Sequence, residues 1–159
     1  MAILPQSGRV TIAESILERP IHLAWGAGDG SWVTPPPEDD NATALTTELA
    51  RRTATELAYV LPSPTGDIIL PSGRYVRSVN PTKYIYVRTQ FDFADAENQT
   101  IREIAVFVGT EVQSGLPAGQ QYFVPSEIVN PGRLLHIEHL APIIRSINIR
   151  ESFEVVINF

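Results

Sequence analysis

The chain has 159 residues and a formal net charge of −6, with 43% hydrophobic and 19% charged residues. This length predicts one domain, residues 1–159, that is large enough to bury a core. The acidic balance argues against nucleic acid as a partner, because nucleic-acid-binding domains usually carry a basic face. The lack of cysteine excludes disulfides and thiolate metal sites. No apolar run approaches the roughly 20 residues of a membrane span and no secretory signal is visible, so we expect no membrane partner and synthesis in a cytoplasm.

Two early segments have the apolar spacing of α-helices. The first helix is predicted over residues 7–19, ends at Pro20 and leads into a short apolar strand, Ile21–Trp25. The second helix is predicted over roughly 41–52, because acidic residues that suit a helix N-terminus precede it and two leucines at helical spacing follow.

The segment between these helices is predicted to be a loop with a tight turn and a proline-rich stretch. Asp29 can accept backbone amide hydrogens as an Asx turn, and the glycines around it permit backbone angles that other residues resist. These structural turn glycines are Gly26, Gly28 and Gly30. The proline-rich loop covers residues 33–41, where Pro35, Pro36 and Pro37 favour an extended backbone.

Alternation of apolar and polar residues predicts strands through the rest of the chain. They cover residues 55–61, a hairpin over 68–79, 84–93, 100–112, 134–144 and, in the C-terminal segment 145–159, residues 147–159. Residues 113–133 are predicted to form a loop. Early helices followed by a run of strands predict an α+β fold, with two N-terminal helices packed on a mostly antiparallel β-sheet.

The predicted strand over residues 100–112 carries one charged residue at a core position. Glu103 shares a face with Ala105 and Phe107, and a buried carboxylate needs a cationic partner. Arg51 or Arg52, at the end of the predicted second helix, is expected to form a structural ion pair with it.

Three motifs stand in a recognisable order along the chain. They are Trp25-Gly26-Ala27-Gly28-Asp29-Gly30, then Thr43-Ala44-Leu45-Thr46-Thr47-Glu48 with the following Arg51-Arg52 pair, and finally Thr100-Ile101-Arg102-Glu103-Ile104-Ala105-Val106-Phe107. This order resembles the N-terminal, virion-attachment domain of phage tail-collar fibre proteins over roughly residues 8–110. The sequence departs from that family at Ala105, where a glycine is usual, and it reaches Phe159 without a fibre shaft or tip.

The resemblance implies a structural, non-enzymatic protein of the phage tail, without cofactor or metal. It would act as a tail-fibre, baseplate or collar adaptor in the virion, after synthesis in the host cytoplasm. Its expected partners are itself, as a trimer or a ring of sixfold or related symmetry, and neighbouring tail proteins. The interface candidates are Trp32, Pro35, Pro36, Pro37, Tyr122 and Phe159. The C-terminal strand could add to the sheet edge of a neighbour.

A small carbohydrate-binding module at a fibre tip is the alternative function, because Trp25 and Trp32 flank the glycine turn and could stack on a sugar. Other chemistries fit the sequence less well. The turn lacks the G-x-G-x-x-G spacing of a phosphate loop, and no G-x-S-x-G nucleophile turn is present. The acidic residues Asp29, Glu38, Asp39 and Asp40 lack the order of a Ca²⁺ loop. On a strand, His136 and Glu138 share one face while His139 points away, which disfavours a zinc site.

Overall fold

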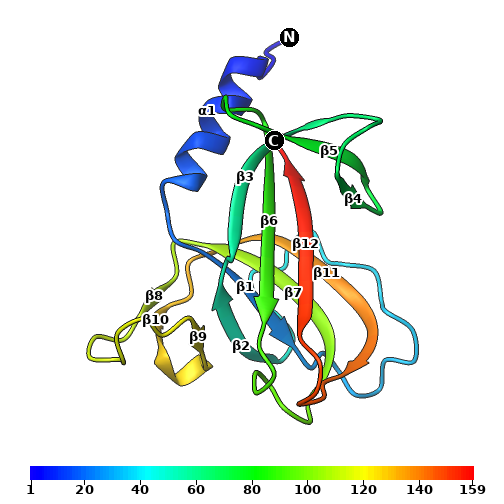
Figure 1. Cartoon of the computed structure of the whole chain (residues 1–159), viewed down its shortest axis with the longest axis vertical. Helices are drawn as coiled ribbons and strands as arrows, with labels where there is room; N and C mark the ends of the chain where they lie inside the picture. The colour runs from blue at the N-terminus through cyan, green and yellow to red at the C-terminus, as the bar shows by residue number, and fades with distance from the viewer. The chain divides into compact units, whose positions relative to one another are not determined.

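The computed structural model describes residues 1–159 as a mostly β chain with one α-helix, twelve strands and one 3-10 turn (Figure 1). The predicted α+β class, with two N-terminal helices, is therefore wrong. The chain divides into two compact units. Unit 1 comprises Met1–Arg19, Ala54–Thr89 and Ser152–Phe159, and unit 2 comprises Pro20–Thr53 and Gln90–Glu151.

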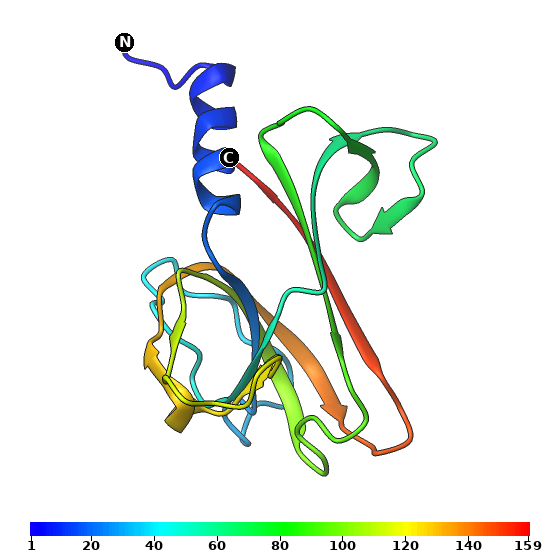
Figure 2. The same ribbon diagram turned by 60° about the vertical axis from the view of Figure 1, so that its left-hand side comes forward.

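Unit 1 combines the helix with a five-stranded antiparallel sheet of order β12-β6-β3-β5-β4. The elements are α1 (Gln6–Leu17), β3 (Glu56–Pro62), β4 (Ile68–Leu70), β5 (Gly73–Ser78), most of β6 (Tyr84–Phe91) and most of β12 (Glu151–Asn158). Figure 2 shows the short β4–β5 hairpin folded over beyond the end of β3. On one face of this sheet, a buried cluster holds Val60, Ile68, Tyr75 and Tyr86.

Unit 2 contains a second five-stranded sheet of order β11-β7-β1-β2-β9. Its strands are β1 (Ile21–Gly26), β2 (Glu48–Thr53), β7 (Thr100–Val108), β9 (Tyr122–Phe123) and β11 (Arg133–Ile144). A separate small sheet pairs β8 (Glu111–Val112) with β10 (Ile128–Asn130), after the 3-10 turn η1 (Pro125–Glu127). Every residue of β1 is buried, so β1 and its neighbour β7 form the centre of this unit.

The predicted second helix over 41–52 is replaced by an irregular segment and the strand β2. Threonines at 43, 46 and 47 are poor helix formers, and residues 48–53 pair with strands distant in the sequence instead. The strand β2 pairs antiparallel with β1, where Arg51 lies opposite Ala24, and with β9 on its other side. Tertiary strand pairing thus overrides the local helical spacing.

The remaining elements follow the alternation of the sequence closely. The first helix, the strand after Pro20, the 68–79 hairpin and the strands near 55–61, 84–93 and 134–144 all occur, with bounds shifted by a few residues. The segment 113–133 contains β9, η1 and β10 as well as loops, and strand structure in 145–159 begins at Glu151. The twelve residues of α1 fall short of the length that a membrane-crossing helix needs.

Candidate assembly surface

The three motifs of the sequence converge on the side chain of Glu103. This side chain is fully buried, and its residue lies directly opposite Gly26 in the β1–β7 pair. Its carboxylate accepts hydrogen bonds from the backbone amides of Thr46 (3.1 Å) and Thr47 (2.8 Å). A Cβ atom at position 26 would lie 2.7 Å from Glu103 Cγ, so only glycine fits there. One carboxylate therefore fixes the end of the long loop to the central strands.

The two arginines predicted to pair with Glu103 have other partners. The Arg51 guanidinium is buried, binds Glu48 through Nε (2.6 Å) and Nη2 (3.0 Å), and lies 3.7 Å from the ring centre of Phe107. Arg52 binds Asp92 (2.8 Å) and Asp95 (2.7 Å). The structure thus does not bring Glu103 together with either arginine, because backbone amides meet its need for donors.

The glycine turn is held by contacts within the loop. Asp29 Oδ1 accepts a hydrogen bond from Ser31 N (2.8 Å), which closes an Asx turn. Gly28 has a φ of +61°, and a Cβ atom there would lie 2.6 Å from Cζ3 of Trp32. The half-buried Trp32 ring also lies 4.8 Å from the ring of His139. Much of the Trp32 ring is therefore buried by contacts within this protein.

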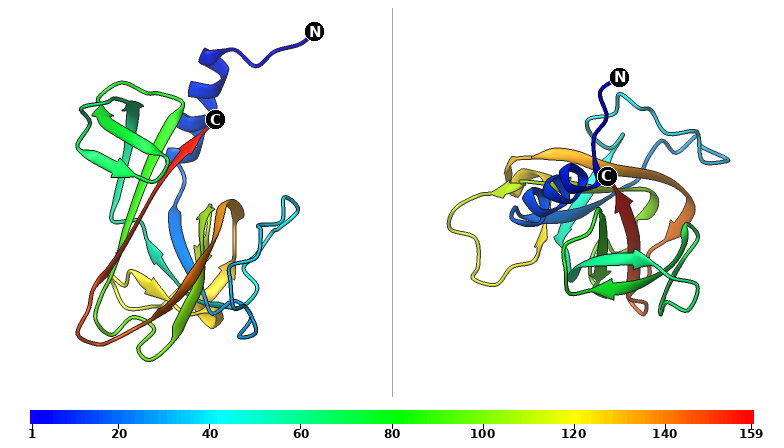
Figure 3. Two further views of the ribbon diagram at one scale, coloured as in Figure 1. Left: turned by 90° about the vertical axis from the view of Figure 1, so that its right-hand side faces the viewer. Right: turned by 90° about the horizontal axis from the view of Figure 1, so that it is seen from above.

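The proline-rich loop is fastened to the edge strand β11 through His139. The backbone N–H of His139 donates to Glu38 Oε1 (3.0 Å), and its Nδ1 lies 2.9 Å from the carbonyl oxygen of Pro36. Figure 3 shows the loop (cyan) beside β11 (orange). The bond from the His139 amide holds the pKa of the Glu38 carboxyl below its usual value. Pro35 and Pro37 remain exposed.

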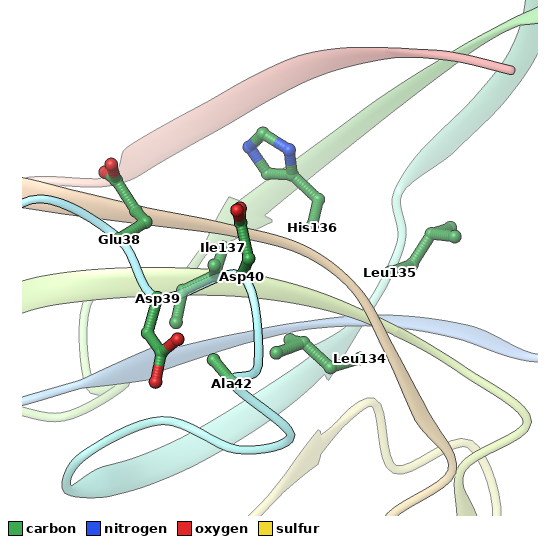
Figure 4. Close-up of a pocket in the computed structure, with 8 residues that line it drawn as sticks. All are labelled: Glu38, Asp39, Asp40, Ala42, Leu134, Leu135, His136 and Ile137. Atoms are coloured by element: carbon green, nitrogen blue, oxygen red, sulfur yellow. The ribbon is translucent and has the colours of Figure 1, made fainter.

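A pocket of about 340 Å³ opens between this loop and β11 (Figure 4). Its lining consists of Glu38, Asp39, Asp40, Ala42, Leu134, Leu135, His136 and Ile137. Burial lowers the pKa of His136 from its ordinary value, which favours the neutral imidazole. No three histidine or carboxylate side chains of the chain are placed to hold a metal ion. The pocket is thus an acidic surface beside an edge strand.

Unit 1 presents an exposed surface of a different kind. Leu61 and Val76 lie opposite each other on the β3–β5 pair and are 45% and 42% exposed. Ile69 and Val79 are still more exposed. A second pocket, of about 360 Å³, includes Val10 of α1 and Leu61 in its lining. By strand register and alternation, Leu57, Leu61, Ile69 and Val76 share one side of the sheet, and they define the apolar face of unit 1.

The two remaining interface candidates take part in packing or pairing within their own units. Tyr122 is half-buried, and its ring meets Trp25 and Phe91 edge-on at centroid distances of 6.5 and 6.4 Å. Phe159 is also half-buried, and its backbone N–H donates to the carbonyl oxygen of Lys83 (3.1 Å). Their buried parts serve the fold.

Sequence reasoning missed one buried cation that organises unit 2. The Arg145 side chain is buried and donates to the carbonyl oxygens of Asp92 (2.8 Å), Asp95 (3.2 Å) and Ile149 (3.0 Å). Its guanidinium lies 5.0 Å from the ring centre of Trp25. Asp92 and Asp95 lie about fifty residues away in the sequence, so no local residue pattern could identify these two partners.

A mostly β protein with exposed acidic and apolar surfaces has the features of an assembly component. The whole chain, residues 1–159, matches the family model described as "Baseplate wedge 3 tail fiber network component". The chain belongs to this family. No curated protein matches it. The family is one of phage tail fibre and baseplate proteins, and the match does not support the more specific resemblance to the collar-fibre attachment domain. The protein is thus a structural component of the phage baseplate in the virion tail, where it contacts other tail proteins.

Proposed function

We propose that the protein is an adaptor that joins the tail-fibre network to the baseplate by protein–protein contacts alone. The observation that carries this proposal is the presence of two chemically different exposed surfaces on separate units. Unit 2 offers the acidic pocket beside β11, and unit 1 offers the apolar face around Leu61 and Val76. An adaptor needs two distinct binding surfaces, since each partner must be recognised by its own chemistry.

The copies of the protein are proposed to form a trimer or a ring of sixfold or related symmetry within the virion. Closed symmetric assembly is the rule for repeated subunits, and a sheet edge provides one route to it. The strand β12 lies at an edge of the unit 1 sheet, so it is the element that would add to a neighbour. The exposed Pro35 and Pro37 are further proposed contacts, with Trp32, Pro36, Tyr122 and Phe159 at the margins.

A phage that lacks the gene for this chain tests the adaptor role directly. We expect its particles to carry baseplates without an attached fibre network when viewed by electron microscopy, and we expect the wild-type gene supplied in trans to restore the fibres. Normally attached fibres in the deletion phage would refute the proposal. Saturable sugar binding by the purified chain, lost on Trp32→Ala, would instead support a carbohydrate-binding module.

A further inference from the structure

The outer edge of β11 is open over a short stretch. The strand β11 pairs with β7 on one side and has no strand on the other. The His139 N–H points outward, since it donates to Glu38. In an antiparallel ladder every second residue directs its N–H and C=O to the same side, so the backbone polar groups of Ile137 also point outward. On the C-terminal side of His139, Pro142 lacks an N–H and disfavours strand pairing. The part of the edge that can still pair is therefore the stretch around Ile137.

This open edge borders the acidic pocket. Of the three carboxylates there, Glu38 accepts the His139 amide, and Asp39 Oδ1 accepts the amide of Asn41 (2.9 Å). Asp40 is exposed and has no hydrogen-bond or ion-pair partner. In Figure 4, the side chains of Glu38, Asp40 and His136 point to the same side of β11. The pocket therefore combines unpaired backbone groups with a negative charge that nothing in the chain neutralises.

We propose that the edge of β11 around Ile137 binds an extended segment of a different tail protein, with a lysine side chain placed between Glu38 and Asp40. The segment adds as a sixth strand to the unit 2 sheet, so its backbone pairs with Ile137 while its basic side chain meets the carboxylates. This inference rests on the proposed adaptor function, because it takes a neighbouring tail protein as the occupant.

A second copy of the chain fits this site less well than a different protein. Most of its arginine side chains already have carboxylate or carbonyl partners, such as Arg77 with Glu56 (2.7 Å) and Arg74 with Gly66 (2.9 Å). The cationic side chains without such partners are Arg9, Arg19, Lys83 and Arg133. Two are on or beside α1 and Lys83 precedes the interior strand β6, so these three do not lie on an edge strand. Arg133 is the first residue of the edge strand β11 itself and lies outside the lining of the acidic pocket. Charge complementarity therefore favours a basic segment from elsewhere.

The first experiment measures binding of a defined probe to the full-length protein. The probe is a nine-residue peptide of alternating valine and threonine with a central lysine, and its partner peptide has glutamate at the centre. We expect saturable binding of the lysine peptide by fluorescence polarisation, at least tenfold weaker binding of the glutamate peptide, and a shift of the Ile137 amide resonance by NMR. A peptide that is N-methylated on the amides facing β11 should not bind, whereas a peptide N-methylated on the intervening amides should bind normally.

Matched charge reversals place the binding on the protein. Asp40→Lys should weaken binding of the lysine peptide at least tenfold, whereas Glu97→Lys should leave it within twofold. Glu97 is a suitable control because it is an exposed carboxylate of unit 2 outside the pocket. Equal effects of the two substitutions, or unchanged binding of both N-methylated peptides, would overturn the proposal.

Cross-linking in purified baseplates tests the natural occupant. A carbodiimide joins a carboxylate to a lysine in direct contact, so we expect a cross-link from Glu38 or Asp40 to a lysine of another tail protein. A cross-link to a second copy of the chain, or none at these positions while other carboxylates react, would overturn the inference but leave the adaptor function standing. Absence of the chain from baseplates would instead refute the adaptor function, while peptide binding would still report on the β11 edge.

Discussion

The two units hold their cores together in different ways. Unit 2 buries charged side chains: Glu103, Arg51 and Arg145 are all at most 2% exposed, and each has specific hydrogen-bond partners. Unit 1 buries an apolar and aromatic cluster around Val60 and Tyr86, and its main ion pairs lie at the surface. More than half of the exposed large apolar side chains belong to unit 1, although it is the smaller unit.

This contrast indicates that unit 2 is built to hold a fixed geometry and unit 1 to contact another surface. A buried charge with fixed partners tolerates one geometry, because a displaced partner leaves an uncompensated charge. Unit 2 therefore holds its loop and its edge strand in defined places. An apolar face makes few directional demands but leaves hydrophobic area in water, which marks it as a site for contact with another surface. Unit 1 therefore has the properties of a contact surface, and substitutions in the two units should behave differently.

The largest effect is expected for Glu103→Ala in unit 2. The substitution removes the acceptor for the amides of Thr46 and Thr47 and leaves a cavity beside Gly26. We expect the free energy of unfolding to fall by about 2–4 kcal/mol, with about half that loss for Glu103→Gln, which keeps one acceptor. Urea unfolding measures the change, and the exposed Glu97→Gln should be neutral. A neutral Glu103→Ala would show that water replaces the carboxylate without cost.

The same variant tests the prediction that residues 1–159 are one domain. Both tryptophans, at 25 and 32, lie in unit 2, so tryptophan fluorescence reports on that unit alone. Hydrogen exchange at the amides of Val60 and Tyr86 reports on unit 1. If the chain is one cooperative domain, Glu103→Ala should lower protection at both amides by the amount seen in fluorescence. Unchanged protection in unit 1 would mean that the units unfold separately.

Much of the β structure could be predicted from the sequence, because alternation and turn residues are local signals. The hairpin over 68–79 and the strand near 84–93 needed no long-range information. The helix predicted over 41–52 is wrong because leucines four residues apart are compatible with a helix, and only pairing with β1 and β9 decides for a strand. The burial of Glu103 followed from strand alternation. Its partners did not, since a backbone amide leaves no signature in the residue type.

A smaller loss is expected for Arg51→Met, which can be compared with the same change in unit 1. Methionine keeps much of the aliphatic stem but removes the bonds to Glu48 and to Thr110 Oγ1 (2.9 Å). We expect a loss of about 2–3 kcal/mol in the free energy of unfolding, because the polar groups around a buried guanidinium are left without donors. Arg77→Met breaks exposed ion pairs to Glu56 and Asp67 and should cost under about 1 kcal/mol. Similar losses would contradict the contrast between the units.

A pH-dependent effect of similar or smaller size is expected from His22. Burial, reinforced by the nearby Arg51 charge, lowers its pKa from 6.5 to about 4. Between these values the unfolded chain binds a proton at His22 that the folded chain does not. Protonation of His22 therefore costs the folded state no stability above pH 6.5, and the cost grows as the pH falls toward 4. This term should reach about 2–3 kcal/mol by pH 4. His22→Gln should remove it from the pH profile of urea unfolding. An unchanged profile would show that other groups cause the loss of stability at low pH. Unit 1 contains no histidine, so it makes no comparable contribution.

The smallest effect on stability is expected on the apolar face of unit 1, where the consequence should appear in assembly instead. Leu61→Ser and Val76→Ser alter side chains that are already about half exposed, so each should cost under about 1 kcal/mol in the free energy of unfolding. Because the same side chains are proposed to contact a neighbouring subunit, the double variant should be depleted from purified baseplates at least several-fold when it competes with wild-type protein. Ile144→Ser is the matched control, since Ile144 is an exposed apolar residue of unit 2 outside both proposed surfaces. Equal incorporation of the double variant, the control and wild type would show that exposed hydrophobic area in unit 1 is not used for contact.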